Sequence, residues 1–167
     1  LNPRKRVVDL IAQGPIVHGT PKAEAHARAR ELLELVELTP AAAERYPHEF
    51  SGGQRQRIGI ARALAMQPRV IVADEPVSAL DVSVQAQVLR LLADLRDRLN
   101  LSLLFVTHDL RVAAQLCDKV IVMQKGEIVE AGPTARVFAA PAHPYTQALL
   151  DSIPGRDWQP PRLDALG

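Results

Sequence analysis

Hydrophobic residues in the first part of the chain recur at helical spacing. Within residues 22–36 they stand three or four positions apart with charged residues between them, which predicts an amphipathic helix that starts after Pro21. A second helical pattern covers residues 51–64 and stops before Pro68, because a residue that precedes proline disfavours helical geometry. We therefore expect residues 1–66 to be mostly helical.

The pattern then changes to short, continuous apolar runs rich in β-branched residues. These runs cover residues 70–73, 101–106 and 120–123, and such runs are typical of strands buried on both faces of a sheet. Helices are expected between them at residues 83–99 and 110–116. Strands that alternate with helices predict an α/β fold with a parallel sheet and right-handed crossovers.

The last part of the chain differs in composition. Residues 124–127 read as a hairpin turn that leads into a strand at residues 128–130. Residues 132–167 are rich in proline and alanine, and we expect an appendage with short helices near residues 134–138 and 145–150. We expect the last dozen residues to be disordered.

Composition excludes several classes of function. The chain has 167 residues, 47% of them hydrophobic and 23% charged, which is the balance of a soluble globular protein. With a formal charge of +1, the chain has no overall positive field that would attract nucleic acid or an anionic membrane surface. The apolar runs are far shorter than the ~20 residues that cross a bilayer, so any membrane role must go through a partner. Cys117 is the only cysteine, so an internal disulfide is impossible, and this agrees with a reducing cytoplasm.

The first candidate site is Ser51-Gly52-Gly53-Gln54. It stands at the predicted start of a helix, where unpaired backbone N–H groups and the helix dipole favour a phosphate. The two glycines would let the backbone approach an anion closely, and the Ser51 hydroxyl adds a donor. An ordinary serine N-cap followed by a glycine turn explains these four residues equally well.

A second candidate is the pair of carboxylates in Asp74-Glu75-Pro76. They follow a predicted strand, and ligands bind at the carboxyl ends of parallel strands in open α/β sheets. Asp74 there can hold Mg²⁺ through water, and Glu75 can orient or deprotonate an attacking water. Taken alone, the same residues would more often form a helix N-cap.

Two further polar segments follow strands or turns. Ser78-Ala79-Leu80-Asp81 is by itself only a helix-start turn, and Thr107-His108-Asp109 by itself favours a helix-capping turn. The remaining histidines have less support: His18 and His26 lie outside any motif and are expected to be exposed, whereas His48 precedes the Ser51 segment and is expected to shape it rather than react.

Taken together, these segments resemble the motifs of ABC ATPases. The run from Ser51 to Ala63 resembles the signature motif, the strand that ends in Asp74 resembles Walker B, and residues 78–81 resemble the D-loop. Residues 81–88 and 143–150 resemble the oligopeptide and dipeptide importer branch of that family. The resemblance covers essentially the whole chain.

The resemblance implies a role for each motif. Ser51, Gly52, Gly53 and Gln54 would reach the γ-phosphate of ATP held by a second ATPase subunit. Asp74 would hold Mg²⁺, Glu75 would act as general base, and His108 would contact the γ-phosphate as the switch histidine. Ser78, Ala79, Leu80 and Asp81 would lie at the dimer interface.

The resemblance also implies an organisation and partners. Residues 1–66 would be the ABC helical subdomain, residues 67–131 the C-terminal half of a P-loop (RecA-like) nucleotide-binding core, and residues 132–167 the importer-type extension. The expected cofactors are ATP and Mg²⁺. The expected partners are a second ABC ATPase subunit, integral-membrane permease subunits and, indirectly, a solute-binding protein, at the cytoplasmic face of the cell membrane. The transported solutes would be peptides or similar small molecules, and nucleic acid is not expected.

The chain departs from the family pattern in two respects. None of its four lysines stands in a G-x-x-x-x-G-K-[ST] loop, so we expect this C-terminal part to bind ATP weakly and to be inactive alone. We also expect an uncovered apolar face on the remaining strands, and hence poor solubility or self-pairing. The second departure concerns the tail, where one cysteine excludes the iron–sulfur centre of some relatives.

Two alternatives share these motifs. A soluble ABC ATPase acting on DNA or ribosomes would have the same signature, but such proteins usually add heptad arms, zinc cysteines or basic linkers, and this sequence has none. The other alternative is a truncated, non-catalytic ABC fragment.

Overall fold

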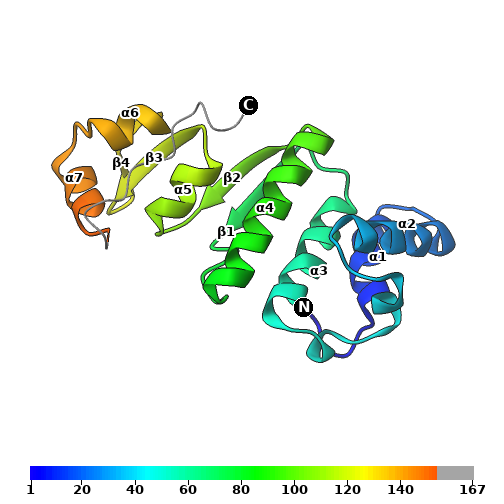
Figure 1. Ribbon diagram of the computed structural model, residues 1–167. Coiled ribbons are helices and arrows are strands. Elements are labelled where there is room, and N and C mark those ends of the chain that lie inside the picture. Colours follow the sequence, from blue (N-terminus) through cyan, green and yellow to red (C-terminus); the bar gives the residue numbers. More distant parts are fainter. Residues whose placement is uncertain (154–167) are drawn as a thin grey trace. The chain divides into compact units, whose positions relative to one another are not determined.

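The computed structural model describes residues 1–153, which fall into two compact units that meet between Leu104 and Phe105 (Figure 1). The first unit contains the elements α1 (Val7–Val17), α2 (Lys22–Leu35), the 3₁₀ turns η1 (Pro40–Glu44) and η2 (Pro47–Glu49), α3 (Gly52–Leu64), β1 (Val70–Asp74) and α4 (Val82–Leu99). The strand β2 (Ser102–Val106) follows, and the second unit continues with α5 (Leu110–Leu116), β3 (Lys119–Gln124), β4 (Glu127–Pro133), α6 (Thr134–Ala139) and α7 (Pro144–Asp151). The expected disorder of the last dozen residues lies outside the described range, and the three predicted domains stay predictions.

Helices α1, α2 and α3 pack together through their apolar sides. The predicted helices at residues 22–36 and 51–64 are confirmed as α2 and α3. Helix α1 is an element that the hydrophobic pattern did not single out, because Gly14 and Pro15 near its end are helix breakers. Its buried side is nevertheless strongly apolar, and the fully buried side chains of the three helices include Val7, Leu10, Ile11, Leu32, Leu33 and Ile58.

Arg57 ties α3 to the end of α2. Its side chain is only 12% exposed, and Nη1 donates to the carbonyl oxygen of Val36 at 3.1 Å and pairs with the carboxylate of Glu37. Val36 is the C-cap of α2, so the guanidinium satisfies a carbonyl that the helix leaves unpaired. The helix that carries the Ser51 motif is therefore anchored to its neighbour by a charged contact as well as by apolar packing.

The expected α/β core is present in reduced form. Strands β1 and β2 are neighbours in a two-stranded sheet, with α4 as the connection between them. The prediction that the strands are buried on both faces was wrong for this sheet. Val70 and Val72 are 55% and 64% exposed, because the described residues leave one side of β1 uncovered. The prediction of an uncovered apolar face agrees with these exposures.

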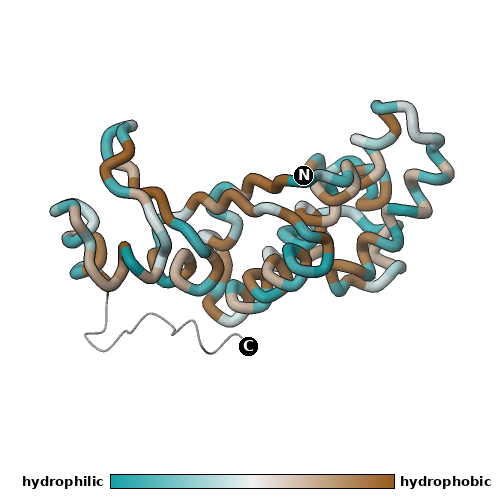
Figure 2. Tube along the Cα trace, turned by 90° about the horizontal axis from the view of Figure 1, so that it is seen from above, coloured by the Kyte–Doolittle hydropathy of each residue, from teal (hydrophilic) through white to brown (hydrophobic). Residues whose placement is uncertain are grey.

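The third predicted strand does not extend the parallel sheet. Strand β3 pairs antiparallel with β4, from Lys119 opposite Pro133 to Gln124 opposite Glu127. The reason is the predicted turn: Lys125 and Gly126 have φ values of 53° and 85°, a pair that produces a tight hairpin of the hand that matches strand twist. The two predicted short helices follow as α6 and α7. Hydrophobic stretches alternate with hydrophilic ones along the described chain (Figure 2).

Candidate functional site

Ser51 caps helix α3 in the way that the sequence predicted. Its hydroxyl accepts a hydrogen bond from the Gln54 amide at 3.3 Å, and the Gln54 side-chain oxygen accepts from the Ser51 amide at 3.0 Å. This reciprocal pair is a capping box. The first amide that donates within the helix is that of Arg55, to the Ser51 carbonyl oxygen. The amides of Gly52 and Gly53 come before it, so they belong to the positive end of the helix, at which a phosphate would bind.

The two glycines also have a packing role that sequence reasoning missed. A Cβ on Gly52 would lie 3.2 Å from Leu80 Cδ2, and a Cβ on Gly53 would lie well inside 3.0 Å of Val84 Cγ1. Helix α3 therefore begins directly against the 78–81 segment and the first turn of α4. The closeness of Val84 in α4 favours glycine at position 53 whether or not a phosphate binds, whereas the flexible end of Leu80 leaves more room at position 52.

Glu75 has an unusual backbone conformation at the end of β1. Its φ is +43°, a left-handed value that costs a non-glycine residue energy. The Glu75 carbonyl oxygen accepts hydrogen bonds from the Ser78 amide at 3.3 Å and from the Ser78 hydroxyl at 3.1 Å. These bonds hold the turn that connects the carboxylates to residues 78–81. Four other non-glycine residues, Glu37, Gln67, Asn100 and Lys125, also have positive φ values, so we infer no function from this conformation alone.

One pocket of about 710 Å³ in the first unit brings several of these residues together. From the predicted site it includes Gly52, Glu75 and residues 78–80. Five other predicted residues of the first unit do not line it: Ser51, Gly53, Gln54, Asp74 and Asp81. The other lining residues are Leu1, Pro3, Pro47, His48, Arg55, Gln56, Gly59 and Pro76.

Three lining residues from α3 were missed at the sequence level. Arg55, Gln56 and Gly59 stand three, four and seven positions after Gly52, which is the spacing of one helix face. Helical spacing counted from Gly52 was the signal that could have found them. Arg55 is held in place by a 2.9 Å hydrogen bond from Nη1 to the carbonyl oxygen of Phe50.

His48 lies in η2 at the edge of this pocket. Its ring stacks on Tyr46, with ring centroids 5.8 Å apart and an interplanar angle of 15°. Next to it, Arg45 lies 4.4 Å from the Phe50 ring centroid and donates to the Glu49 carbonyl oxygen at 2.6 Å. These contacts fix the approach to Ser51, and the shaping role of His48 stays a prediction.

His108 belongs to the second unit, where its side chain is exposed. The residues on either side of it form a turn: the Asp109 amide donates to Thr107 Oγ1 at 3.0 Å, and Asp109 Oδ1 accepts from the Arg111 amide at 2.9 Å. Partial burial opposes ionisation of Asp109, but the hydrogen bonds and charge of Arg111 keep its pKa below the ordinary value. The local geometry is a capped helix start, as the simpler interpretation predicted.

A magnesium site would draw on Asp74. In the described range no three histidine, cysteine or acidic side chains gather as metal ligands. Mg²⁺ commonly uses one or two carboxylates and keeps several waters. The exposed Asp74 carboxylate at the end of β1 fits that chemistry, with Glu75 beside it in sequence.

Comparison with known proteins shows which family models match the chain. Residues 1–78 match the family model described as "ABC transporter". The chain is similar to ABC transporter ATP-binding proteins. Residues 129–165 match a second model, "Oligopeptide/dipeptide transporter, C-terminal region", which confirms the branch that the C-terminal residues suggested.

Curated members of the ABC transporter ATP-binding family are similar over most of the chain. A "Putative peptide import ATP-binding protein" of Brucella ovis is 55% identical over 94% of this chain and 50% of the relative. The dipeptide transport ATP-binding protein DppF of Lactococcus lactis is 54% identical over 94% of this chain and 51% of the relative. The chain thus spans about half the length of these relatives.

A solved structure supports the fold. The chain is similar to "An inward-facing conformation of a putative metal-chelate type ABC transporter", with a TM-score of 0.76, 32% identity, and coverage of 88% of this chain and 58% of the other. The predicted partial nucleotide-binding α/β fold is confirmed by this match. No helix among residues 1–153 is both long and apolar enough to cross a bilayer.

Proposed function

We propose that this chain supplies the signature motif, the magnesium-binding aspartate and the catalytic glutamate of an ABC importer ATPase. The observation that carries the proposal is the pocket of the first unit, in which the face of α3 that starts at Gly52 meets Glu75 and residues 78–80. A capped helix start beside a carboxylate combines an anion site with a group able to activate water.

The residues divide the work of phosphoryl transfer. The first-turn amides of α3, with the Ser51 hydroxyl, would bind the γ-phosphate of ATP held by a second subunit. Asp74 would hold Mg²⁺, which neutralises phosphate charge when bound. Glu75 would accept a proton from, or orient, the attacking water, and His108 would hold the γ-phosphate from its own segment. Residues 78–81, which pack against α3, would transmit the state of one subunit to the other.

The transport role rests on the importer branch. The C-terminal match and the names of the relatives support peptides or similar small solutes as the cargo, moved through permease subunits with a solute-binding protein. The chain would act from the cytoplasmic face of the membrane through its permease partners.

The decisive test is Glu75→Gln in a full-length importer ATPase that contains this chain. We expect turnover to fall by about 100-fold or more, the size typical of losing a positioned base, while ATP binding is kept. Glu127→Gln is the matched control, because Glu127 is an exposed residue of the β3–β4 hairpin. ATP hydrolysis and nucleotide binding would be measured on both variants. Equal hydrolysis by Glu75→Gln and the parent would remove Glu75 from this role.

A second arm of the same experiment uses the 167-residue chain alone. It contains no G-x-x-x-x-G-K-[ST] loop, so we expect hydrolysis at background level. Turnover by the chain alone at a rate comparable with the full-length protein would contradict the assignment of phosphate binding to that loop.

A further inference from the structure

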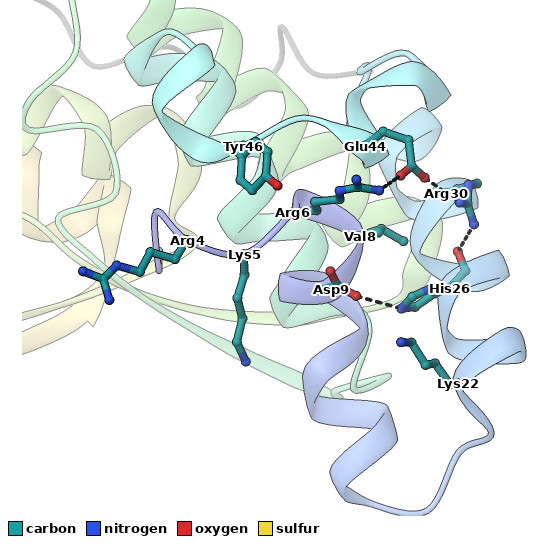
Figure 3. Close-up of a pocket in the computed structure, with 10 residues that line it drawn as sticks. All are labelled: Arg4, Lys5, Arg6, Val8, Asp9, Lys22, His26, Arg30, Glu44 and Tyr46. Carbon is teal, nitrogen blue, oxygen red and sulfur yellow. Dashed lines mark hydrogen bonds and ion pairs between the residues drawn. The ribbon is translucent and has the colours of Figure 1, made fainter.

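A second pocket, of about 480 Å³, lies in the helical part of the first unit and shares no residue with the pocket at Glu75. Its lining comes from the segment before α1, the start of α1, one side of α2 and the region of η1. We call it the basic pocket (Figure 3), and its residues are Arg4, Lys5, Arg6, Val8, Asp9, Lys22, His26, Arg30, Glu44 and Tyr46.

The basic pocket concentrates positive charge in a nearly neutral chain. Five of its residues are lysine or arginine and only two are acidic, whereas the whole chain has 20 basic and 19 acidic residues. The overall charge of +1 therefore hides a local excess of cations. A cavity lined by one sign of charge raises the local concentration of oppositely charged ligands.

Two arginines of the pocket are already committed to an internal carboxylate. Arg6 Nη1 lies 2.8 Å from one oxygen of Glu44, and Arg30 Nη2 lies 2.8 Å from the other. Hydrogen bonding, first from Arg30, holds the pKa of Glu44 below its ordinary value, so this carboxylate stays ionised. The pocket thus already binds one carboxylate, through the guanidinium groups best suited to that shape.

The second acid is also occupied. Asp9 Oδ1 lies 3.1 Å from His26 Nε2, and this contact bridges α1 and α2. The sequence-based expectation that His26 is exposed was wrong: its side chain is 20% exposed and Nε2 is buried. A histidine carries charge only when it is protonated, so we count Asp9 as a negative charge of the pocket; five basic side chains still face only two acidic ones.

Lys5 and Lys22 are cations of the pocket without an internal partner in the described part of the chain. Neither forms an ion pair or side-chain hydrogen bond within residues 1–153, and Figure 3 draws both ammonium groups without a contact. They come from separate segments, one before α1 and one in the first turn of α2. An incoming anion would therefore gain two charges without breaking an existing pair. Arg4 points away from the other side chains in Figure 3, so we assign it no part.

We propose that the basic pocket binds a phosphate group, carried either by a soluble phosphorylated compound or by a lipid headgroup. Ammonium groups act as point charges and suit phosphate, whereas the guanidinium forks that would favour a second carboxylate already hold Glu44. A dianion also gains more from two free cations than a monoanion does. The volume lies within the range of small-molecule sites. The site does not depend on the function proposed above, since it uses none of the residues of that site.

The four lysines of the chain provide a matched test. Lys5 and Lys22 line the basic pocket, while Lys119 and Lys125 are exposed in the β3–β4 hairpin. The probe is inorganic pyrophosphate, titrated calorimetrically at low ionic strength into the 167-residue chain. We expect Lys5→Gln/Lys22→Gln to weaken binding by roughly tenfold or more, and Lys119→Gln/Lys125→Gln to leave it within about twofold.

The outcomes separate clearly. Equal weakening by the two double variants would mean a general charge effect, and no weakening by Lys5→Gln/Lys22→Gln would place the anion elsewhere, such as at the start of α3. Either result, or no binding to the parent, overturns the proposal. Amide and side-chain NMR shifts of the parent at Lys5 and Lys22 on adding pyrophosphate test the same point without a variant.

Vesicles distinguish the source of the phosphate. The parent and both double variants would be sedimented with phosphatidylcholine vesicles that contain or lack phosphatidic acid. Binding to the acidic vesicles that is lost only in Lys5→Gln/Lys22→Gln indicates a lipid headgroup. Pyrophosphate binding without vesicle binding indicates a soluble ligand.

Discussion

The absence of one Cβ at Gly53 sets how closely α3 approaches α4. A methyl group at Gly53 would lie well inside 3.0 Å of Val84 Cγ1, and Gly53 is buried, so the two helices would have to move apart. We expect Gly53→Ala to lower the free energy of unfolding by about 1–3 kcal/mol, the usual cost of overpacking. Urea unfolding followed by circular dichroism would measure it.

Gly59 is the matched control, two turns further along the same helix. Within residues 1–153, no atom beyond its chain neighbours and its own helix backbone lies within 4 Å of a Cβ built there, so Gly59→Ala adds a methyl group without a clash. Alanine is a better helix former than glycine, and we expect this variant to gain about 0.5–1 kcal/mol. Equal effects of the two substitutions would contradict the packing role of Gly53.

Single residues of the site could be predicted only in part. The Ser51 cap follows from a local signal, serine with glutamine three positions later, and the capping box confirms it. The left-handed backbone of Glu75 could not be predicted, because glutamate seldom adopts φ near +43° and only the surrounding turn imposes it. The contact of Gly53 with Val84 depends on tertiary packing between residues 31 positions apart.

At the scale of elements, Glu130 joins strand β4 to helix α7. Its two carboxylate oxygens accept from the amides of Ala142 at 2.9 Å and His143 at 3.1 Å, and Glu130 is only 9% exposed. His143 in turn caps α7, with Nδ1 accepting from the Tyr145 amide at 3.1 Å. The carboxylate thus fixes the segment that leads into the last described helix.

The same contacts make this junction sensitive to pH. The Ala142 amide is the first cause of a lowered pKa at Glu130, and the Thr146 hydroxyl is the second. A depressed folded-state pKa adds stability that is complete above the unfolded-state value near 4.5 and is lost as the pH falls through the folded-state value. We expect Glu130→Gln to speed hydrogen exchange at Ala142 and His143 at neutral pH.

Thermal melts from neutral pH to about pH 3 would complete this test. The difference in melting temperature between the parent and Glu130→Gln should shrink as the pH falls below the ordinary value for glutamate. Glu127→Gln, in the same strand but exposed, should behave like the parent throughout. If the difference in melting temperature between Glu130→Gln and the parent is constant with pH, the negative charge of Glu130 does not contribute to stability.

Elements with local signals could be predicted, and those defined by distant partners could not. Helices α2, α3 and α5 and the β3–β4 turn follow from periodicity, capping residues and a Lys-Gly pair. Helix α1 was missed because its Pro15 is a breaker by local rules, although buried apolar residues hold it in place. The hairpin of β3 with β4 was predicted from its turn, but the expected place of β3 in the parallel sheet was wrong, because a continuous apolar run does not say which sheet a strand joins.

At the scale of the whole molecule, the exposed valines of β1 are expected to cause self-association in solution. Val70 and Val72 alternate along β1 and are 55% and 64% exposed, so they present one apolar face of a strand. Removing such surface from water is favourable at about 25 cal/mol per Å², and exposed apolar strands pair with further chains. We expect the 167-residue chain to self-associate reversibly as its concentration rises, and sedimentation equilibrium would measure the dissociation constant.

Substitutions that keep the shape of a side chain but change its polarity test whether the exposed face of β1 causes self-association. Val70→Thr/Val72→Thr preserves volume and β-branching, and we expect it to weaken self-association by roughly tenfold because each hydroxyl must be desolvated on pairing. Val17→Thr/Val82→Thr is the matched control, since those valines are 75% and 82% exposed but lie in helices. Unchanged association in the strand variant, or equal loss in the control, would show that the β1 face is not the contact. A monomer at every concentration would mean that the exposed valines are tolerated singly, as scattered surface apolar residues are.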